Sequence, residues 1–220
     1  MTVALPASAL RSLRSSGFHY QPGVEPEACL PIAESLGFPV GDARSPDPLR
    51  FISPQPVATA KPNTLSSRYG MGAFPFHTDA AYWPIPPRFI LFHCLSPGAG
   101  SRPTLLIDPR LWRLLDGERR ALCNEVWRLT TKRPFLCTAG TQRDGGLCLR
   151  FDEACMTPVT AGALSVRDTI RDAIRSSDVI TIHWRRGDLL LMDNLRLLHA
   201  RGEARYPDED RVLARILIRG

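Results

Sequence analysis

The sequence contains no run of about 18 apolar residues, the length that would indicate a membrane span. Its first 30 residues also lack the apolar segment of a secretory signal. The six cysteines form no CxxC pair, and six residues separate the closest two, Cys148 and Cys155. Cysteines of this kind, in a chain without a secretory signal, are expected to be reduced thiols. We therefore expect a cytoplasmic location and no membrane partner.

The sequence also lacks a basic block, although its formal net charge is +6. No stretch of lysine and arginine is longer than two residues, and acidic residues are mixed among them. Without a basic patch or an interleaved aromatic stripe, nucleic-acid binding is not favoured. The positive excess suits a small anionic substrate instead. Nothing in the sequence indicates an oligomeric state.

With 220 residues, of which 44% are hydrophobic, the chain is large enough for one domain with a substantial core. No internal repeat or long linker divides it, so we interpret residues 1–220 as a single domain. Its 20 prolines are concentrated in 21–63 and 84–109, which indicates many turns.

Strand patterns outnumber helical patterns along the chain. Short apolar runs separated by turns predict strands at 89–95, 104–107, 147–151, 179–184, 188–192 and 211–218. Amphipathic spacing predicts helices at 25–38, 108–129 (one broken helix or two short ones) and 163–177. A mainly β chain with inserted helices is typical of a sandwich or a jelly roll.

The stretch FPFHTDAAYW, residues 74–83, places His77 and Asp79 among apolar neighbours. In a strand, residues two apart point to the same face, so the two side chains would project side by side. A buried carboxylate is costly unless a partner compensates for its charge. The candidates here are a salt bridge and a metal ion.

Four further residues have side chains that suit such a site. Thr104 begins a predicted strand, His199 follows another, and Arg211 and Arg215 lie four apart on one face of a third. Two histidines and a carboxylate are the facial triad of non-haem iron(II), which leaves positions open for a co-substrate and oxygen. The same donors would also accept zinc. A dicarboxylate co-substrate would need a buried cation, which Arg211 can supply, and a hydroxyl donor such as Thr104.

On these residues the chain resembles the taurine dioxygenase-like (TauD/TfdA) family of iron(II)/2-oxoglutarate-dependent oxygenases. The resemblance runs from about Ser66 to the C-terminus. It rests on FHTD, on the 24 residues between Asp79 and Thr104, on GDLLLMDNLRLLH, and on the 11 residues between His199 and Arg211.

The resemblance implies a double-stranded β-helix, that is, a jelly roll with flanking helices. It implies that His77, Asp79 and His199 bind iron and that Thr104 and Arg211 hold the distal carboxylate of 2-oxoglutarate. Oxygen and 2-oxoglutarate would react at the iron, with release of carbon dioxide and succinate and hydroxylation of an aliphatic C–H. Desaturation remains open as another outcome.

For the substrate, the resemblance suggests a small polar molecule such as an amino acid, a sulfonate or another anion. An arginine at the offset of Arg215 contacts the anionic group of the substrate in such enzymes. Halogenation is disfavoured, because related halogenases replace the carboxylate found here as Asp79. The 94 residues between Thr104 and His199 form a segment shorter than is usual in the family, which predicts a reduced lid and a more open pocket.

Two rival functions remain, a non-enzymatic jelly-roll binding module and oxidation of a nucleobase in nucleic acid. We expect Asp188, Asp193 and Asn194 to set turns rather than take part in the chemistry. The stretch Ser66–Gly70 is a candidate lid. The other histidines are expected in the core or at the surface: His19, His93 and His183.

Overall fold

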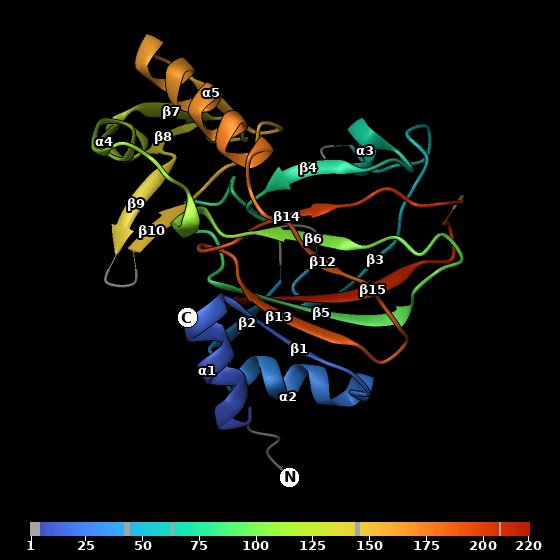
Figure 1. Ribbon diagram of the computed structural model, residues 1–220. Helices are drawn as coiled ribbons and strands as arrows, with labels where there is room; N and C mark the ends of the chain where they lie inside the picture. The colour runs from blue at the N-terminus through green and yellow to red at the C-terminus, as the bar shows by residue number, and fades with distance from the viewer. Residues whose placement is uncertain (1–4, 42–44, 63, 144–145, 207) are drawn as a thin grey trace.

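Two antiparallel β-sheets face each other and enclose apolar side chains between them in the computed structural model (Figure 1). The model describes residues 5–41, 45–62, 64–143, 146–206 and 208–220. The larger sheet has the order β1-β13-β5-β15-β2, with β3 also paired to β15, and the smaller has the order β12-β6-β14-β4. This arrangement confirms the predicted double-stranded β-helix.

The strands of the two sheets are short, apart from β5 and β15. The larger sheet comprises β1 (Phe18–Gln21), β2 (Phe38–Val40), β3 (Leu49–Ile52), β5 (Phe89–Ser96), β13 (Leu189–Asp193) and β15 (Val212–Arg219). The smaller sheet comprises β4 (Phe74–His77), β6 (Thr104–Ile107), β12 (Ile180–Ile182) and β14 (Leu198–Arg201).

The core between the sheets is built from the alternate residues of these strands that point inward. Phe92 of β5, Leu106 of β6 and Leu213 of β15 belong to one buried cluster. The intervening residues of β15 and β13 point to the other face, where α1 (Ala7–Ser16) and α2 (Cys29–Glu34) cover the larger sheet. A single-turn helix, η1 (Pro26–Ala28), leads into α2.

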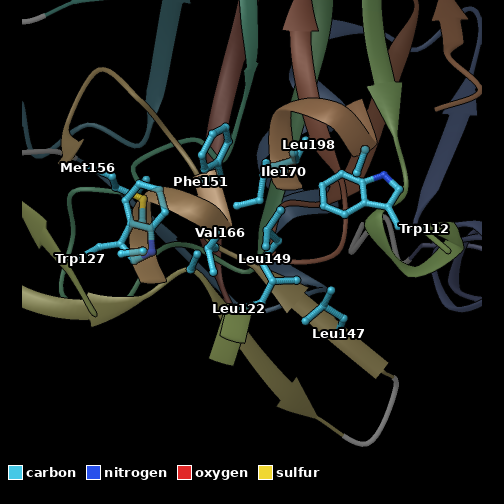
Figure 2. Packing of buried hydrophobic residues seen from close by; sticks show 14 of the residues in the cluster. Trp112, Leu122, Trp127, Leu147, Leu149, Phe151, Met156, Val166, Ile170 and Leu198 are labelled. Atoms are coloured by element: carbon cyan, nitrogen blue, oxygen red, sulfur yellow. The ribbon is translucent and has the colours of Figure 1, made fainter. Parts of the chain in front are cut away.

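The segment between β6 and β12 packs at one end of the two sheets around its own apolar cluster (Figure 2). Trp127 and Leu122 are fully buried there, and Leu198 of β14 joins the same cluster. The elements are η2 (Pro109–Leu111), α4 (Asp116–Asn124), β7 (Val126–Leu129), β8 (Phe135–Thr138), β9 (Gly140–Arg143), β10 (Gly146–Leu149), β11 (Met156–Pro158) and α5 (Ala161–Arg175). β11-β7-β8 form one sheet and β9-β10 another.

Most predicted strands are present within a residue or two of their expected ends. The strand predicted at 147–151 ends at Leu149, and the helix predicted at 25–38 ends at Glu34 and gives way to β2. The prediction of helix at 108–129 was wrong at its end, because 126–129 is strand β7. Val126 and Trp127 suit a strand better than a helix because branched and aromatic side chains pack well on a sheet.

The described part of the chain contains no helix that is long and apolar enough to cross a membrane.

The burial pattern of β6 gives a direct test of the two-sheet core. Leu106 is 0% exposed between the sheets, so Leu106→Ala is expected to lower the free energy of unfolding by about 2–5 kcal/mol. The control Leu136→Ala removes the same atoms from a side chain that is 64% exposed. It should change the free energy of unfolding by less than about 0.5 kcal/mol. Urea denaturation measures both values, and equal effects would contradict the assigned core.

Candidate metal centre

His77 and His199 lie directly opposite each other on the neighbouring antiparallel strands β4 and β14. Their ring centroids are 4.3 Å apart, and both side chains are buried. The ring of Phe92, from the facing sheet, lies 5.8 Å from that of His199. The histidine pair therefore sits between the two sheets. As expected, His199 follows an apolar strand, β13, and the turn at Asp193-Asn194; it lies in the next strand, β14.

Hydrogen bonding leaves ring nitrogens available on both histidines. Nδ1 of His77 lies 3.1 Å from the carbonyl oxygen of Pro75, to which it can donate, so that Nε2 becomes the free ligand atom. Nδ1 of His199 is buried without a hydrogen-bond partner among the described residues. Burial, assisted by His77, lowers the pKa of His199 to about 3 although Asp79 opposes the shift. A neutral imidazole is the form that binds a metal.

Asp79 is placed by hydrogen bonds to its backbone and not by strand geometry, since β4 ends at His77. The Asp79 amide donates to Oδ1 of Asn194 at 2.8 Å, and Nδ2 of Asn194 donates to the Asp79 carbonyl at 3.1 Å. The same Nδ2 donates to the carbonyl of Pro87 at 2.9 Å. The premise that Asp79 lies two residues along a strand from His77 was therefore wrong, although the two groups lie close enough to affect each other electrostatically.

Thr78, between the two candidate ligands, ties them to the segment inserted between β6 and β12. Its amide donates to the carbonyl of Phe151 at 2.7 Å, and its hydroxyl donates to the carbonyl of Leu149 at 3.1 Å. The amide of Phe151 donates to the same hydroxyl. The inserted segment thus helps to hold the His-Thr-Asp turn in place.

The carboxylate of Asp79 forms a salt bridge with Arg215 of β15. Oδ2 lies 2.7 Å from Nη1 of Arg215, while Oδ1 accepts the Ala80 amide at 3.0 Å. Burial alone would raise the pKa of Asp79, but Arg215, His199 and His77 together hold it below its usual value. The carboxylate is thus ionised, and its charge is compensated by a salt bridge within the protein.

The donor set fits iron(II): two imidazoles and one ionised carboxylate. Among the described residues, however, no group of three or more His, Cys, Asp or Glu side chains is arranged to hold a metal ion as it stands. The two histidines are adjacent, whereas both oxygens of Asp79 are engaged by Arg215 and Ala80. The carboxylate is the member of the triad that has other partners.

The two residues predicted for the co-substrate are both buried. Thr104 pairs with Arg201 of β14, and its Oγ1 accepts the indole N–H of Trp184 at 3.0 Å. The threonine hydroxyl keeps its own proton to donate. Arg211, which directly precedes β15, is 4% exposed; its Nε has no hydrogen-bond partner, and no salt bridge of the described residues includes it.

Positive charge accumulates around Arg211. Arg102 and Arg201 are also buried, and Asp208 is the carboxylate to which Arg102 pairs, at 3.1 Å. Burial and the repulsion of Arg102 lower the pKa of Arg211 to about 10, although Asp208 opposes them. Arg211 therefore stays charged at neutral pH. Three guanidinium groups and one carboxylate form a site that favours an incoming anion.

Arg102 and Arg201 also fix the chain just after α3 (Ser66–Tyr69), the stretch predicted as a lid. Arg201 donates to the carbonyl oxygens of Gly70 and Gly72, and Arg102 donates to that of Met71. Two of the three buried guanidinium groups, those of Arg102 and Arg201, therefore donate hydrogen bonds to backbone carbonyl oxygens. The third, that of Arg211, is left for another partner.

Asn194 is the site residue that sequence reasoning missed, because an Asp-Asn pair after an apolar strand is an ordinary turn signal. It is 0% exposed and connects Asp79 to Pro87. Asp193 does set the turn, as expected, by accepting the amides of Leu195 and Arg196. Two other histidines have other surroundings: His93 bonds to the carbonyl of Val24, and His183 is exposed.

Comparison with known proteins agrees with this geometry. The family model described as "Taurine catabolism dioxygenase TauD, TfdA family" matches residues 110–217. The match includes His199, Arg211 and Arg215. His77, Asp79 and Thr104 precede it, and the fold brings them to the matched residues.

The 3-((Z)-2-isocyanoethenyl)-1H-indole synthase of Fischerella ambigua (strain UTEX 1903) is 27% identical over 161 residues. The match covers 59% of this chain and 58% of that protein. Among solved structures, asparagine oxygenase in complex with Fe(II), 2S,3S-3-hydroxyasparagine and succinate has a TM-score of 0.76 at 19% identity, over 97% of this chain and 79% of that one.

The non-heme iron oxygenase OrfP in complex with Fe and alpha-ketoglutaric acid has a TM-score of 0.76 at 18% identity, over 98% of this chain and 81% of that one. At these identities the likeness to solved structures establishes the fold.

The bonds from Asn194 predict an effect on metal binding as well as on stability. Asn194→Ala removes three hydrogen bonds and leaves buried groups unpaired, so the free energy of unfolding should fall by about 2–4 kcal/mol. Because Asp79 loses its anchor, Mn²⁺ affinity should fall as well. Asn124→Ala, at an exposed site, is the control. Lower stability with unchanged Mn²⁺ affinity would show that Asn194 does not position the ligand.

Asp208 is expected to be essential to the arginine cluster. Asp208→Asn leaves three buried guanidinium groups without a carboxylate, and should lower the free energy of unfolding by about 3–5 kcal/mol. The exposed neighbour Asp210→Asn is the matched control. Thermal or urea unfolding decides the matter, and a loss below about 1 kcal/mol in Asp208→Asn would contradict the proposed charge balance.

Proposed function

We propose that this chain is an iron(II)- and 2-oxoglutarate-dependent dioxygenase that hydroxylates an aliphatic C–H of a small polar or anionic molecule such as an amino acid. The observation that carries the proposal is the presence of two groups of buried polar side chains, which we propose are the two halves of one site. One half is the facing pair His77 and His199 with Asp79 beside it. The other is the buried Arg211, whose Nε has no hydrogen-bond partner among the described residues, with the Thr104 hydroxyl.

His77, Asp79 and His199 would hold the metal. Iron(II) bound there would supply the activation of oxygen that couples oxidation of 2-oxoglutarate to oxidation of the substrate. The Pro75 carbonyl orients His77, and Asn194 anchors Asp79. Two of the three proposed ligands are therefore held in position by hydrogen bonds to residues that would not touch the metal. Burial of both histidines keeps water away from the reacting groups.

Arg211 and Thr104 would hold the distal carboxylate of 2-oxoglutarate. A planar guanidinium can donate two parallel hydrogen bonds to a carboxylate. Trp184 supports Thr104 by occupying one lone pair of its hydroxyl oxygen, which directs the hydroxyl proton elsewhere. Asp208 and Arg102 surround Arg211 without forming a salt bridge to it among the described residues.

For the substrate, we propose a carboxylate, sulfonate or phosphate group that pairs with Arg215. Arg215 lies on the inner face of β15, opposite Phe92 of β5, and contacts Asp79. It is therefore beside the metal ligands, where a substrate must enter. The structural relatives have names or bound molecules that refer to asparagine and arginine derivatives, which favours an amino acid here.

The rival functions have less support. A non-enzymatic jelly-roll module would have no need of a buried Arg211 whose Nε has no hydrogen-bond partner among the described residues. Oxidation of nucleic acid would require a basic groove, and the sequence has no basic block longer than two residues.

We further propose that residues 1–220 act as one oxygenase domain and that the protein is cytoplasmic, in keeping with its six unpaired cysteines. The more open pocket predicted from the short segment between Thr104 and His199 stays a prediction.

Succinate formation from 2-oxoglutarate tests the activity. His77→Ala, Asp79→Ala and His199→Ala should each abolish iron binding or turnover while circular dichroism shows an intact fold. The candidate substrates are amino acids and small anions, and the true substrate should accelerate succinate formation. Full iron content and activity in Asp79→Ala would contradict the assigned ligands.

The co-substrate half of the site is tested by affinity. Arg211→Ala should weaken 2-oxoglutarate binding by about 2–5 kcal/mol, because a buried carboxylate loses its charged partner. Thr104→Val keeps the shape and should cost about 1 kcal/mol. The apparent affinity for 2-oxoglutarate, at saturating substrate, measures both. An unchanged affinity in Arg211→Ala would mean that another arginine, such as Arg215 or Arg205, binds the carboxylate.

A further inference from the structure

The salt bridge between Asp79 and Arg215 occupies the carboxylate that the proposed metal centre needs. Nη1 of Arg215 lies 2.7 Å from Oδ2 of Asp79, and the two side chains are 20% and 15% exposed. The Ala80 amide occupies Oδ1. The pair is screened from solvent on most of its surface, so its attraction is stronger than that of an exposed pair.

The backbone on both sides of this salt bridge is fixed. Asp79 is bonded through its amide and carbonyl to Asn194. Arg215 lies within β15, paired with Phe92 on one side and Arg50 on the other. Any exchange of partners at the site must therefore come from movement of the two side chains.

Arg215 has capacity for a second acceptor. Its Nε is buried without a hydrogen-bond partner among the described residues. A guanidinium carries five N–H donors in a fixed plane, and the contact with Asp79 uses Nη1. An anion that binds the remaining donors can draw the guanidinium from Asp79, because the anion supplies the negative charge that Asp79 had supplied.

We propose that Arg215 is a latch on Asp79: it holds the carboxylate in a salt bridge until an anionic group of the substrate binds Arg215 and releases Asp79 to the metal. This inference rests on the proposed function, in which Asp79 is a metal ligand. Arg215 is thus a positioning residue for the metal as well as a contact for the substrate. Coupling of this kind is reciprocal, so the metal also strengthens anion binding at Arg215.

The latch is tested by metal affinity without turnover. Mn²⁺ is titrated into the metal-free protein by calorimetry, with no 2-oxoglutarate present. Arg215→Met removes the competing charge and should tighten Mn²⁺ binding about tenfold, within the range usual for coupled sites. The matched control is Arg50→Met, which removes the same charge from the residue directly opposite Arg215 on β3. It should have a much smaller effect.

Two further arms separate the latch from general electrostatics. In the wild type, acetate or methanesulfonate should tighten Mn²⁺ binding, whereas in Arg215→Met neither anion should do so. In a double variant, Arg215→Met with Asp79→Ala, the tightening should disappear because the released ligand is absent. Circular dichroism confirms that each variant is folded.

Unchanged or weaker Mn²⁺ binding in Arg215→Met would overturn the latch and show that Arg215 supports Asp79 as a ligand instead. Equal tightening in Arg50→Met would also overturn it, and so would a wild type that responds to neither anion. Succinate formation is measured separately. Turnover without the predicted tightening disproves the latch alone, and tightening without turnover disproves the dioxygenase activity alone.

Discussion

The site depends on how one buried carboxylate, Asp79, is compensated. It lies between two sheets, beside the imidazoles of His77 and His199, and its charge is balanced by Arg215 from the opposite sheet. A carboxylate at such a position must have a cation, and the fold provides one from β15. The sequence left open whether that cation was an arginine or a metal ion. The structure shows the arginine, and the neighbouring histidines give the reason to expect the metal as well.

The second constraint is the excess of buried positive charge at the other end of the site. Arg102 and Arg201 bond to backbone carbonyl oxygens near α3, and Asp208 balances one guanidinium. Arg211 is left without a salt bridge among the described residues. A buried guanidinium in this state is costly, and a bound carboxylate relieves the cost. The same excess of positive charge therefore gives the site affinity for a dicarboxylate.

Much of this could be predicted from the sequence, because alternating apolar runs fix strands and because the side chains of a metal site are rare in a core. His77, Asp79 and His199 come from two distant segments, and the pairing of β4 with β14 brings them together. The placement of Asp79 could not be predicted from strand periodicity, since β4 ends at His77 and the turn after it depends on Asn194. The salt bridge of Arg215 with Asp79 could not be predicted either, because it depends on how the two sheets pack against each other. Strand β7 was mistaken for the end of a helix because a pattern of four residues is too short to distinguish a strand from a helix.

The most direct test of the central claim is the visible absorption of the anaerobic protein with iron(II) and 2-oxoglutarate. When 2-oxoglutarate chelates iron held by two histidines and a carboxylate, charge transfer from the metal to the keto acid gives a visible band. The account predicts this band in the wild type and its loss in His199→Ala. A wild-type protein that binds iron(II) and 2-oxoglutarate but shows no such band would contradict the assignment of the metal centre.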